Sequence, residues 1–315
     1  MSVQTAFELL LAAVVLGLAI WVIASRETSP AMVGFVAYGL LLALIWVGLG
    51  AVDVALAEAA IGGGLGGVLL LGAAARLQST EARAEAERLG VAVRLAAAAL
   101  SAMVAAALAA AVLMLPYPAP TQAPEAAANA AATGMSNPVT NVLMAFRGTD
   151  TLLEKIVLLL ALIGVWSLAP DRLWGGRPGP RHQADPLGLL AFLARLLAPI
   201  GVVVGVYMLW TGADHPGGAF QGGTILAAMW LLTTMAGLTD TPPVSSHRLR
   251  LVLVAGPGVF LVVGLGGLFF GAGFLAYPAA FAKPLILGIE VAMTLTIAAT
   301  LGLLLAGAPE RSAER

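Results

Sequence analysis

Long apolar stretches recur along the chain, separated by shorter segments rich in Gly, Pro and charged residues. A helix needs about 20 mostly apolar residues to cross the hydrocarbon core of a bilayer. The stretches are too long and too uniformly apolar for strands, and their Ala, Leu and Gly content suits membrane helices. The pattern therefore predicts an all-α polytopic membrane protein with about nine transmembrane helices. The predicted spans cover residues 5–24, 31–50, 54–75, 91–115, 152–169, 188–211, 221–239, 250–271 and 285–306.

Two polar stretches divide these spans into three helical modules. Residues 116–137 are rich in Pro and Ala, and residues 170–187 are rich in Pro, Gly and Arg. Such compositions are typical of loops and linkers. We expect a four-helix module over 1–115 and a second four-helix module over 186–308. Between them, residues 136–170 should form a short lateral helix followed by one span.

Composition excludes several functions. The chain is 60% hydrophobic and only 10% charged, whereas an ordinary globular domain is about a quarter charged, so a soluble protein is excluded. A net charge of −1 provides no basic surface for nucleic acid. There is no Cys, which removes disulfides, zinc–thiolate sites and protein-ligated iron–sulfur clusters. The His residues all fall in predicted loops and cannot ligate a haem in the membrane. We therefore expect no cofactor, no metal site and no enzymatic chemistry in this chain.

Lys and Arg predict the orientation, because cytoplasmic loops are enriched in both. With nine spans the basic segments fall on one side, and the other side has only Arg147, Lys155 and Lys283, each at the edge of a span. We expect the N-terminus outside and the C-terminus in the cytoplasm. The arginines assigned to the cytoplasmic side are Arg26, Arg76, Arg83, Arg88, Arg94, Arg172, Arg177, Arg181, Arg195, Arg248, Arg250, Arg311 and Arg315.

Ionisable residues inside predicted spans are the candidate functional groups, because such residues usually face a bundle interior or water. Asp53 and Glu58 lie at the start of the third span. A position near the membrane interface is favoured for Asp53. Glu58 lies one to two turns deeper, where a buried functional role and a structural hydrogen bond are equally open. The glycines of 62–67 form GxxxG pairs, which allow close approach of helix backbones.

A second charged cluster lies at the start of the fifth span. If one helix runs through this stretch, Arg147, Asp150 and Glu154 share one face. Alternatively, Gly148 is a turn, and Thr149 or Asp150 caps the helix that follows. A buried carboxylate near a cation suits a proton or cation relay, which is our interpretation of Glu154. The alternative is that Glu154 and Lys155 form a surface-anchoring charge pair at a helix start.

Lys283 and Glu290 belong to the last predicted span. They are seven residues apart, so they share one face at a separation of about 10 Å. This distance is too long for a direct salt bridge. Glu290 is the most deeply placed acid, and we expect it to have a partner on another helix or in another protein of a complex.

A glycine-rich loop precedes the seventh span, in WTGADHPGGAFQGGTILAAMW, residues 210–230. No Lys-Ser/Thr follows the glycines, which excludes a P-loop. The Gly-Gly pairs permit close approach or unusual backbone angles at a helix start. Asp214 and His215 fall on the outer loop, and a solvent-facing role is favoured for His215. No other residues stand at metal-ligand spacing.

This loop resembles the signature of the B subunit (MnhB) of Mrp-type multisubunit Na⁺/H⁺ antiporters, Gly-His-Asn-x-Pro-Gly-Gly-Gly-Phe-Gln-Gly-Gly. Ala213, Asp214 and Ala219 depart from it, which leaves the role of the usual His-Asn pair open. We expect the matching glycine-rich core to serve helix packing. The matching residues are Gly212, Pro216, Gly217, Gly218, Phe220, Gln221, Gly222 and Gly223.

Two further segments resemble neighbouring modules. VDVALAEAAIGGGL, residues 52–65, is similar to the module at the C-terminal end of the large Mrp antiporter protein MnhA, which also occurs separately as MbhD in energy-converting membrane-bound hydrogenases. Asp53 and Glu58 match its acids. NVLMAFRGTDTLLEKIVLL, residues 141–159, resembles the next module (MbhE), although Leu153 replaces a Gly. The residues that match this module are Phe146, Arg147, Gly148, Asp150, Thr151 and Glu154.

The resemblance implies a non-redox subunit of an Mrp-type Na⁺/H⁺ antiporter in a prokaryotic cell membrane. Its partners would be large antiporter-like subunits related to respiratory complex I, and Glu154 would take part in coupled ion movement. A membrane-arm subunit of a redox-driven ion pump is the alternative, and a structural scaffold is the third possibility. The ion-path candidates are Glu58, Glu154, Lys155, Lys283 and Glu290, with Asp53, Arg147 and Asp150 at the rim.

Overall fold

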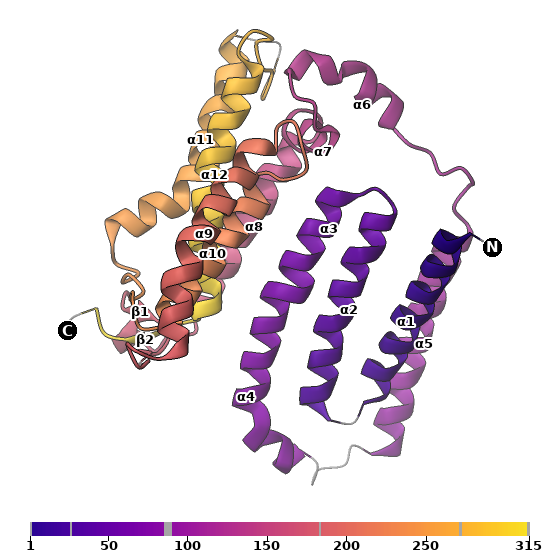
Figure 1. The fold of residues 1–315 in the computed structure, drawn as a ribbon, viewed down its shortest axis with the longest axis vertical. Helices are drawn as coiled ribbons and strands as arrows, with labels where there is room; N and C mark the ends of the chain where they lie inside the picture. Colours follow the sequence, from indigo (N-terminus) through magenta and orange to yellow (C-terminus); the bar gives the residue numbers. More distant parts are fainter. Residues whose placement is uncertain (1, 26, 85–89, 183, 271–272, 314–315) are drawn as a thin grey trace.

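The computed structural model describes residues 2–25, 27–84, 90–182, 184–270 and 273–313. Arg26, Arg88 and Arg315, which contribute to the predicted orientation, lie outside the described residues. The described chain is almost entirely helical, as the apolar pattern predicts. Figure 1 shows two groups of long helices, one from the N-terminal third and one from the C-terminal half, with a small helix crossing between them at one end.

The N-terminal group is a row of long helices (Figure 1). The third long helix of the row is continuous. Its two α-helical parts, α3 and α4, join through the π-helical segment η1 at the Gly-rich stretch. A Cβ at Gly39 would lie 3.0 Å from the carbonyl carbon of Gly62, and one at Gly67 would lie 2.8 Å from a methyl group of Val36. Small residues therefore allow close packing here, as the GxxxG pattern predicts. The elements are α1 (Val3–Ala24), α2 (Thr28–Gly48), α3 (Val52–Glu58), η1 (Ala59–Leu65), α4 (Gly66–Ala84) and α5 (Val91–Leu113).

A chain of short helices connects the two groups. The lateral helix expected before the fifth span consists of two short turns, α7 and η3. Arg147 leaves helical geometry (φ −127°, ψ 33°), so the helix does not continue through this point. The next helix begins at Gly148 without a side-chain cap, so neither Thr149 nor Asp150 is its cap. The elements are α6 (Ala123–Asn129), η2 (Ala130–Thr133), α7 (Pro138–Asn141), η3 (Val142–Phe146) and α8 (Gly148–Trp166).

The C-terminal group is a bundle built around its last helix. α12 packs against α10, α11 and α8, and about half of its residues are buried. Phe260, Ile286, Ile289 and Ile297 are fully buried in the core cluster that these helices share. The long helices of this group are α9 (Leu189–Thr211), α10 (Ala219–Met235), α11 (His247–Phe270) and α12 (Ala282–Ala306).

A two-stranded antiparallel sheet departs from the all-α prediction. β1 (Arg177–Pro178) follows a 3₁₀ turn, η4 (Asp171–Leu173), and pairs with β2 (Pro309–Arg311). Arg311 donates to both carboxylate oxygens of Asp240, at 3.0 and 2.7 Å. These contacts gather the 170–187 linker, the α10–α11 loop and the C-terminal segment at one end of the bundle (Figure 1). Apolar periodicity carries no signal for so short a pairing.

Seven described helices are long and apolar enough to cross a membrane, where the sequence predicts about nine spans. The other two predicted spans are also helical, but one is shorter than the seven and the other contains more charged residues than they do. α10 has 17 residues, and α8 carries Asp150, Glu154 and Lys155 near its start. The chain is thus a multi-pass membrane protein, and its two atypical helices carry the sequence motifs discussed next.

Candidate functional site

A cavity of about 530 Å³ lies where the N-terminal row meets the C-terminal bundle. Its walls come from α3, η1, α7, η3, α8, α10 and α12. All three sequence motifs therefore converge on one space, although they are far apart in the chain. The lining residues are Asp53, Val54, Ala57, Ile61, Val139, Thr140, Leu143, Met144, Thr151, Glu154, Lys155, Gly217, Gly218, Ala219, Phe220, Gln221, Glu290 and Met293.

Asp53 holds the N-terminal row against the glycine-rich loop. Its Oδ1 accepts a hydrogen bond from the backbone N–H of Gly217 at 2.9 Å and a longer one from Asn137 Nδ2 at 3.5 Å. Gln221 Nε2 also donates to the backbone carbonyl of Asp53 at 3.4 Å. A carboxylate is a strong acceptor for backbone N–H groups. Asp53 is therefore a joint between modules as well as a wall of the cavity.

The glycine-rich loop brings backbone close to the cavity. Gly217 and Gly218 have φ of +150° and +124°, values that side chains with a Cβ rarely adopt. A Cβ at Gly223 would lie 2.7 Å from Ile297 of α12, and one at Gly222 would lie 2.7 Å from the carbonyl oxygen of Gly205 in α9. The glycines thus serve the turn into α10 and the contacts of α10 with both neighbouring helices.

Glu290 is buried in the bundle and faces the cavity. Only 4% of the residue is exposed. Its carboxylate lies beside the backbone N–H of Ala219, the first residue of α10. A helix N-terminus favours an anion, because its free N–H groups and its dipole are positive there. Glu290 Oε2 has no hydrogen-bond partner among the described residues, so one acceptor of this acid is available to a proton, a water or a cation.

Lys155 and Glu154 point in different directions, as expected for adjacent residues of a helix. The Lys155 side chain is 9% exposed, and its Nζ lies 5.1 Å from the centre of the Phe220 ring. The Glu154 side chain is 62% exposed, and its Oε2 is 3.9 Å from the same Nζ. Lys155 is therefore the buried member of the pair, whereas sequence reasoning placed the weight on Glu154.

The other candidate charges lie away from this cavity. Glu58 is partly buried, and its Oε1 lies 2.5 Å from where a Cβ of Gly62 would stand, on the next turn of the same helix. Arg147 and Asp150 form an ion pair with each other, and both side chains are largely exposed. Neither residue of this pair nor Glu58 lines the cavity.

Lys283 belongs to a separate ion pair at the N-terminal end of α12. Its Nζ donates to both oxygens of Asp214, at 2.8 and 2.7 Å. Hydrogen bonding to Lys283 lowers the pKa of Asp214 below its ordinary value of 3.8. Lys283 therefore pairs with Asp214 and not with Glu290, in agreement with the prediction that Lys283 and Glu290 form no direct salt bridge.

Asn137 is a site residue that sequence reasoning missed. Its side chain caps α7 by accepting from Val139 N at 2.8 Å, and its Nδ2 donates to the carbonyl oxygen of His215 at 2.9 Å and toward Asp53. Asn followed by Pro138 is a recognisable helix-start pattern. That pattern predicts the cap but not the contacts across the fold.

A smaller cavity of about 260 Å³ adjoins the site on the side of the glycine-rich loop. Asp53, Val54 and Val139 line both cavities. Asp214 and His215 line only the smaller one. No group of three or more His, Asp or Glu side chains arranged to hold a metal ion occurs within the described ranges.

Comparison with known proteins matches two parts of the chain to families. Residues 189–308 match a domain related to the MnhB subunit of Na⁺/H⁺ antiporter, and residues 13–79 match MbhD, the D subunit of MBH. The A/B subunit of a probable K(+)/H(+) antiporter of Rhizobium meliloti is 27% identical over 183 residues, which are 49% of this chain and 18% of that protein. An uncharacterised protein of Methanocaldococcus jannaschii is 27% identical over 154 residues, which are 44% of this chain and 59% of that protein.

Solved structures include a chain with a similar arrangement along nearly the whole length. A chain of the Mrp complex from Dietzia sp. DQ12-45-1b is similar with a TM-score of 0.71 and 26% identity, over 97% of this chain and 35% of that chain. This chain therefore spans only part of that chain and of the curated relatives. It is a multi-pass membrane protein that combines an MbhD domain with a domain related to the MnhB subunit of Na⁺/H⁺ antiporters.

Proposed function

We propose that this chain is a membrane subunit of an Mrp-type multisubunit cation/proton antiporter complex and that the cavity lined by Asp53, Glu154, Lys155 and Glu290 forms part of its ion path. The observation that carries the proposal is the convergence of these charged side chains, from three separate segments of the chain, on one cavity. The matches to the A/B subunit of an antiporter and to a chain of the Mrp complex support the assignment to such a complex.

Hydrated carboxylates in the cavity provide successive binding sites for a proton or a monovalent cation. Glu290 offers an unpartnered oxygen, and Glu154 lines the same space from the opposite helix. Ionisable residues inside a membrane bundle usually mark ion pathways. The adjoining smaller cavity, which shares Asp53, gives this space a route toward the outer surface. Na⁺ and H⁺ are the ions that we assign to the path.

The exposure of Glu154 indicates that another protein of the complex contacts α8 at this position. A charged side chain that is 62% exposed on a spanning helix is costly if it contacts lipid. A second protein or a water-filled boundary removes that cost. α5 has no buried residue along its length, so it too is open to a partner or to lipid. We place the N-terminus outside and the C-terminus in the cytoplasm, which puts both cavities toward the outer half.

The test is transport by the intact complex in everted vesicles, measured as the ΔpH that added Na⁺ or K⁺ dissipates. Glu154→Gln and Glu290→Gln should each reduce the response to a small fraction of the wild-type response while the complex assembles normally. Glu8→Gln is the matched control, because Glu8 is exposed near the N-terminus and accepts a hydrogen bond from Gln4 on its own helix. Unchanged transport in both variants, with normal assembly, would refute a role of these acids in the path.

A second candidate function is a membrane-arm subunit of a redox-driven ion pump. The match of residues 13–79 to the D subunit of MBH favours it. Purification in mild detergent from the native membrane separates the two candidates. Antiporter-like subunits without redox proteins support the antiporter, whereas a co-purifying iron–sulfur or hydrogenase protein supports the pump.

A further inference from the structure

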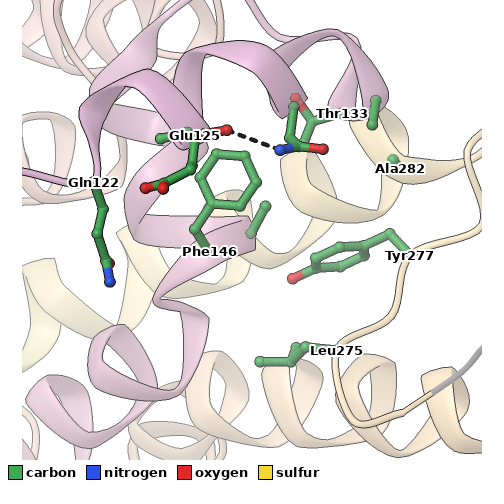
Figure 2. Close-up of a pocket in the computed structure, with 11 residues that line it drawn as sticks. Gln122, Glu125, Thr133, Phe146, Leu275, Tyr277 and Ala282 are labelled. Carbon is green, nitrogen blue, oxygen red and sulfur yellow. Dashed lines mark hydrogen bonds between the residues drawn. The ribbon is translucent and has the colours of Figure 1, made fainter.

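A second large cavity lies on the outer side of the bundle and takes no part in the proposed ion path. It measures about 610 Å³ and lies beneath the small helix α6. Figure 2 shows the side chains around it, with the ring of Phe146 drawn between Glu125 and Tyr277. This volume is within the range of small-molecule sites, about 300–1,000 Å³. The lining residues are Gln122, Glu125, Ala126, Asn129, Ala132, Thr133, Ala145, Phe146, Leu275, Tyr277 and Ala282.

One carboxylate gives this cavity its charge, and no basic side chain lines the cavity to pair with it. Glu125 is the charged side chain among the lining residues, which include no Lys or Arg. The side-chain carboxylate of Glu125 has no hydrogen bond or ion pair within the described part of the chain. The two cations nearest in sequence to the lining are engaged elsewhere, since Arg147 pairs with Asp150 and Lys283 pairs with Asp214. The cavity therefore favours a cation.

Apart from the neutral polar side chains of Gln122, Asn129 and Thr133, the rest of the lining is apolar and aromatic. Phe146 and Tyr277 contribute rings, and Leu275 and several Ala residues contribute aliphatic surface. Tyr277 Oη donates to the carbonyl oxygen of Met144 at 3.0 Å, which fixes the ring in place. Aromatic rings beside a carboxylate suit an ammonium group with an organic body, because a ring face attracts a cation and the body removes apolar surface from water.

Other occupants fit the cavity less well. A metal ion such as Ca²⁺ takes six or more oxygen ligands and favours several carboxylates, whereas one carboxylate and the neutral side chains of Gln122, Asn129 and Thr133 line this space. A phospholipid headgroup brings a phosphate, and the lining has no basic side chain to pair with it. We propose that this cavity binds a small organic cation from the outer side of the membrane, with Glu125 pairing the ammonium group and Phe146 and Tyr277 contacting the organic body.

The cavity shares a wall with the proposed ion path but does not depend on it. η3 separates the two: Ala145 and Phe146 line the 610 Å³ cavity beneath α6, and Leu143 and Met144 line the 530 Å³ cavity of the proposed ion path. An occupant of the cavity beneath α6 therefore contacts this short turn on the side opposite the charged groups. Binding is testable without any transport measurement, so its failure leaves the proposed antiporter function untouched.

The experiment is isothermal titration calorimetry of the full chain in lipid nanodiscs, with empty nanodiscs as the blank. The probe is benzyltrimethylammonium, and benzenesulfonate is the anionic comparison. We expect saturable one-site binding of the cation and none of the anion. Glu125→Gln and Phe146→Leu should each weaken binding about tenfold, whereas Glu8→Gln should leave the affinity unchanged.

Both test substitutions are at exposed positions, so the fold should tolerate them. Far-UV circular dichroism checks that the variants keep their helical content. The proposal is overturned if the probe shows no saturable binding, if benzenesulfonate binds equally well, or if both folded variants bind the probe with wild-type affinity.

Discussion

The backbone N–H of Gly217 donates a hydrogen bond to Oδ1 of Asp53 at 2.9 Å, and this contact joins two residues 164 positions apart in the chain. It ties the start of α3 to the loop that begins α10, and it closes one wall of the charged cavity. The MbhD domain and the MnhB-related domain thus meet through a carboxylate and a glycine backbone. Neither domain on its own contains the complete site.

Removing the Asp53 carboxylate should loosen this joint. We expect Asp53→Ala to lower the stability of the folded chain by about 1.5–3 kcal/mol, the usual contribution of hydrogen bonds to a charged group. Asp53→Asn is the matched control, because its amide oxygen can still accept from Gly217, and it should lose less. Thermal unfolding of the detergent-solubilised chain, followed by size-exclusion chromatography, measures both. Equal unfolding midpoints for Asp53→Ala and Asp53→Asn would contradict a stabilising hydrogen bond between the side-chain oxygen and Gly217.

Lys155 should matter more for transport than for folding. Its buried ammonium contacts the Phe220 ring at 5.1 Å and has only a distant partner in Glu154, at 3.9 Å. Replacing a poorly paired buried charge with an apolar side chain of similar length is often neutral or stabilising. We expect Lys155→Met to keep or raise the thermal midpoint while strongly reducing cation-driven ΔpH in vesicles. A variant that transports normally, or that loses transport only because it unfolds, would speak against this assignment.

The glycines of α10 should be sensitive to a single methyl group. A Cβ at Gly223 would lie 2.7 Å from Ile297, so α10 and α12 must separate to admit it. We expect Gly223→Ala to destabilise the chain by roughly 1–3 kcal/mol, the usual cost of overpacking. Gly164→Ala in α8 is the control, because no atom beyond the adjacent residues and the nearby backbone of α8 lies within 4 Å of the added Cβ, and it should be neutral or slightly stabilising. Thermal unfolding compares them directly.

The ion pair of Lys283 with Asp214 should give the chain an acid-sensitive part of its stability. Hydrogen bonding to Lys283 lowers the pKa of Asp214 below the ordinary 3.8. The unfolded chain therefore binds this proton more tightly than the folded chain. The contribution is present above about pH 4 and is lost as the pH falls through the lowered pKa.

Asp214→Asn should remove that contribution at every pH. Thermal midpoints between pH 3 and pH 7 would then fall less steeply toward acid in the variant than in the wild type. Asp240 shows the same direction of shift, because Arg311 hydrogen-bonds to its carboxylate and lowers its pKa. The ion pair of Asp240 with Arg311 remains intact in the Asp214→Asn variant, so the acid sensitivity that it contributes is the same in the variant and the wild type. Parallel curves for variant and wild type would contradict the role of Asp214.

The apolar pattern alone determined the helical membrane architecture. Lipid cannot hydrogen-bond to the backbone, so each apolar run long enough to span the bilayer has to form a helix. The GGAFQGG loop and the two acidic motifs were also visible, because glycines and intramembrane charges stand out against an apolar background. The short β1–β2 pairing was not visible, since its few residues carry no periodic signal.

Which charges meet was decided only by the tertiary structure. The sequence placed Glu58 and Lys283 on the same list of ion-path candidates as Glu154 and Glu290. Folding turns Glu58 toward its own helix and pairs Lys283 with Asp214, while Lys155 is buried against Phe220. A helix position defines a direction around one axis, but a contact also requires the position and rotation of a second helix. These depend on how distant glycines and apolar side chains pack, and no local pattern contains them.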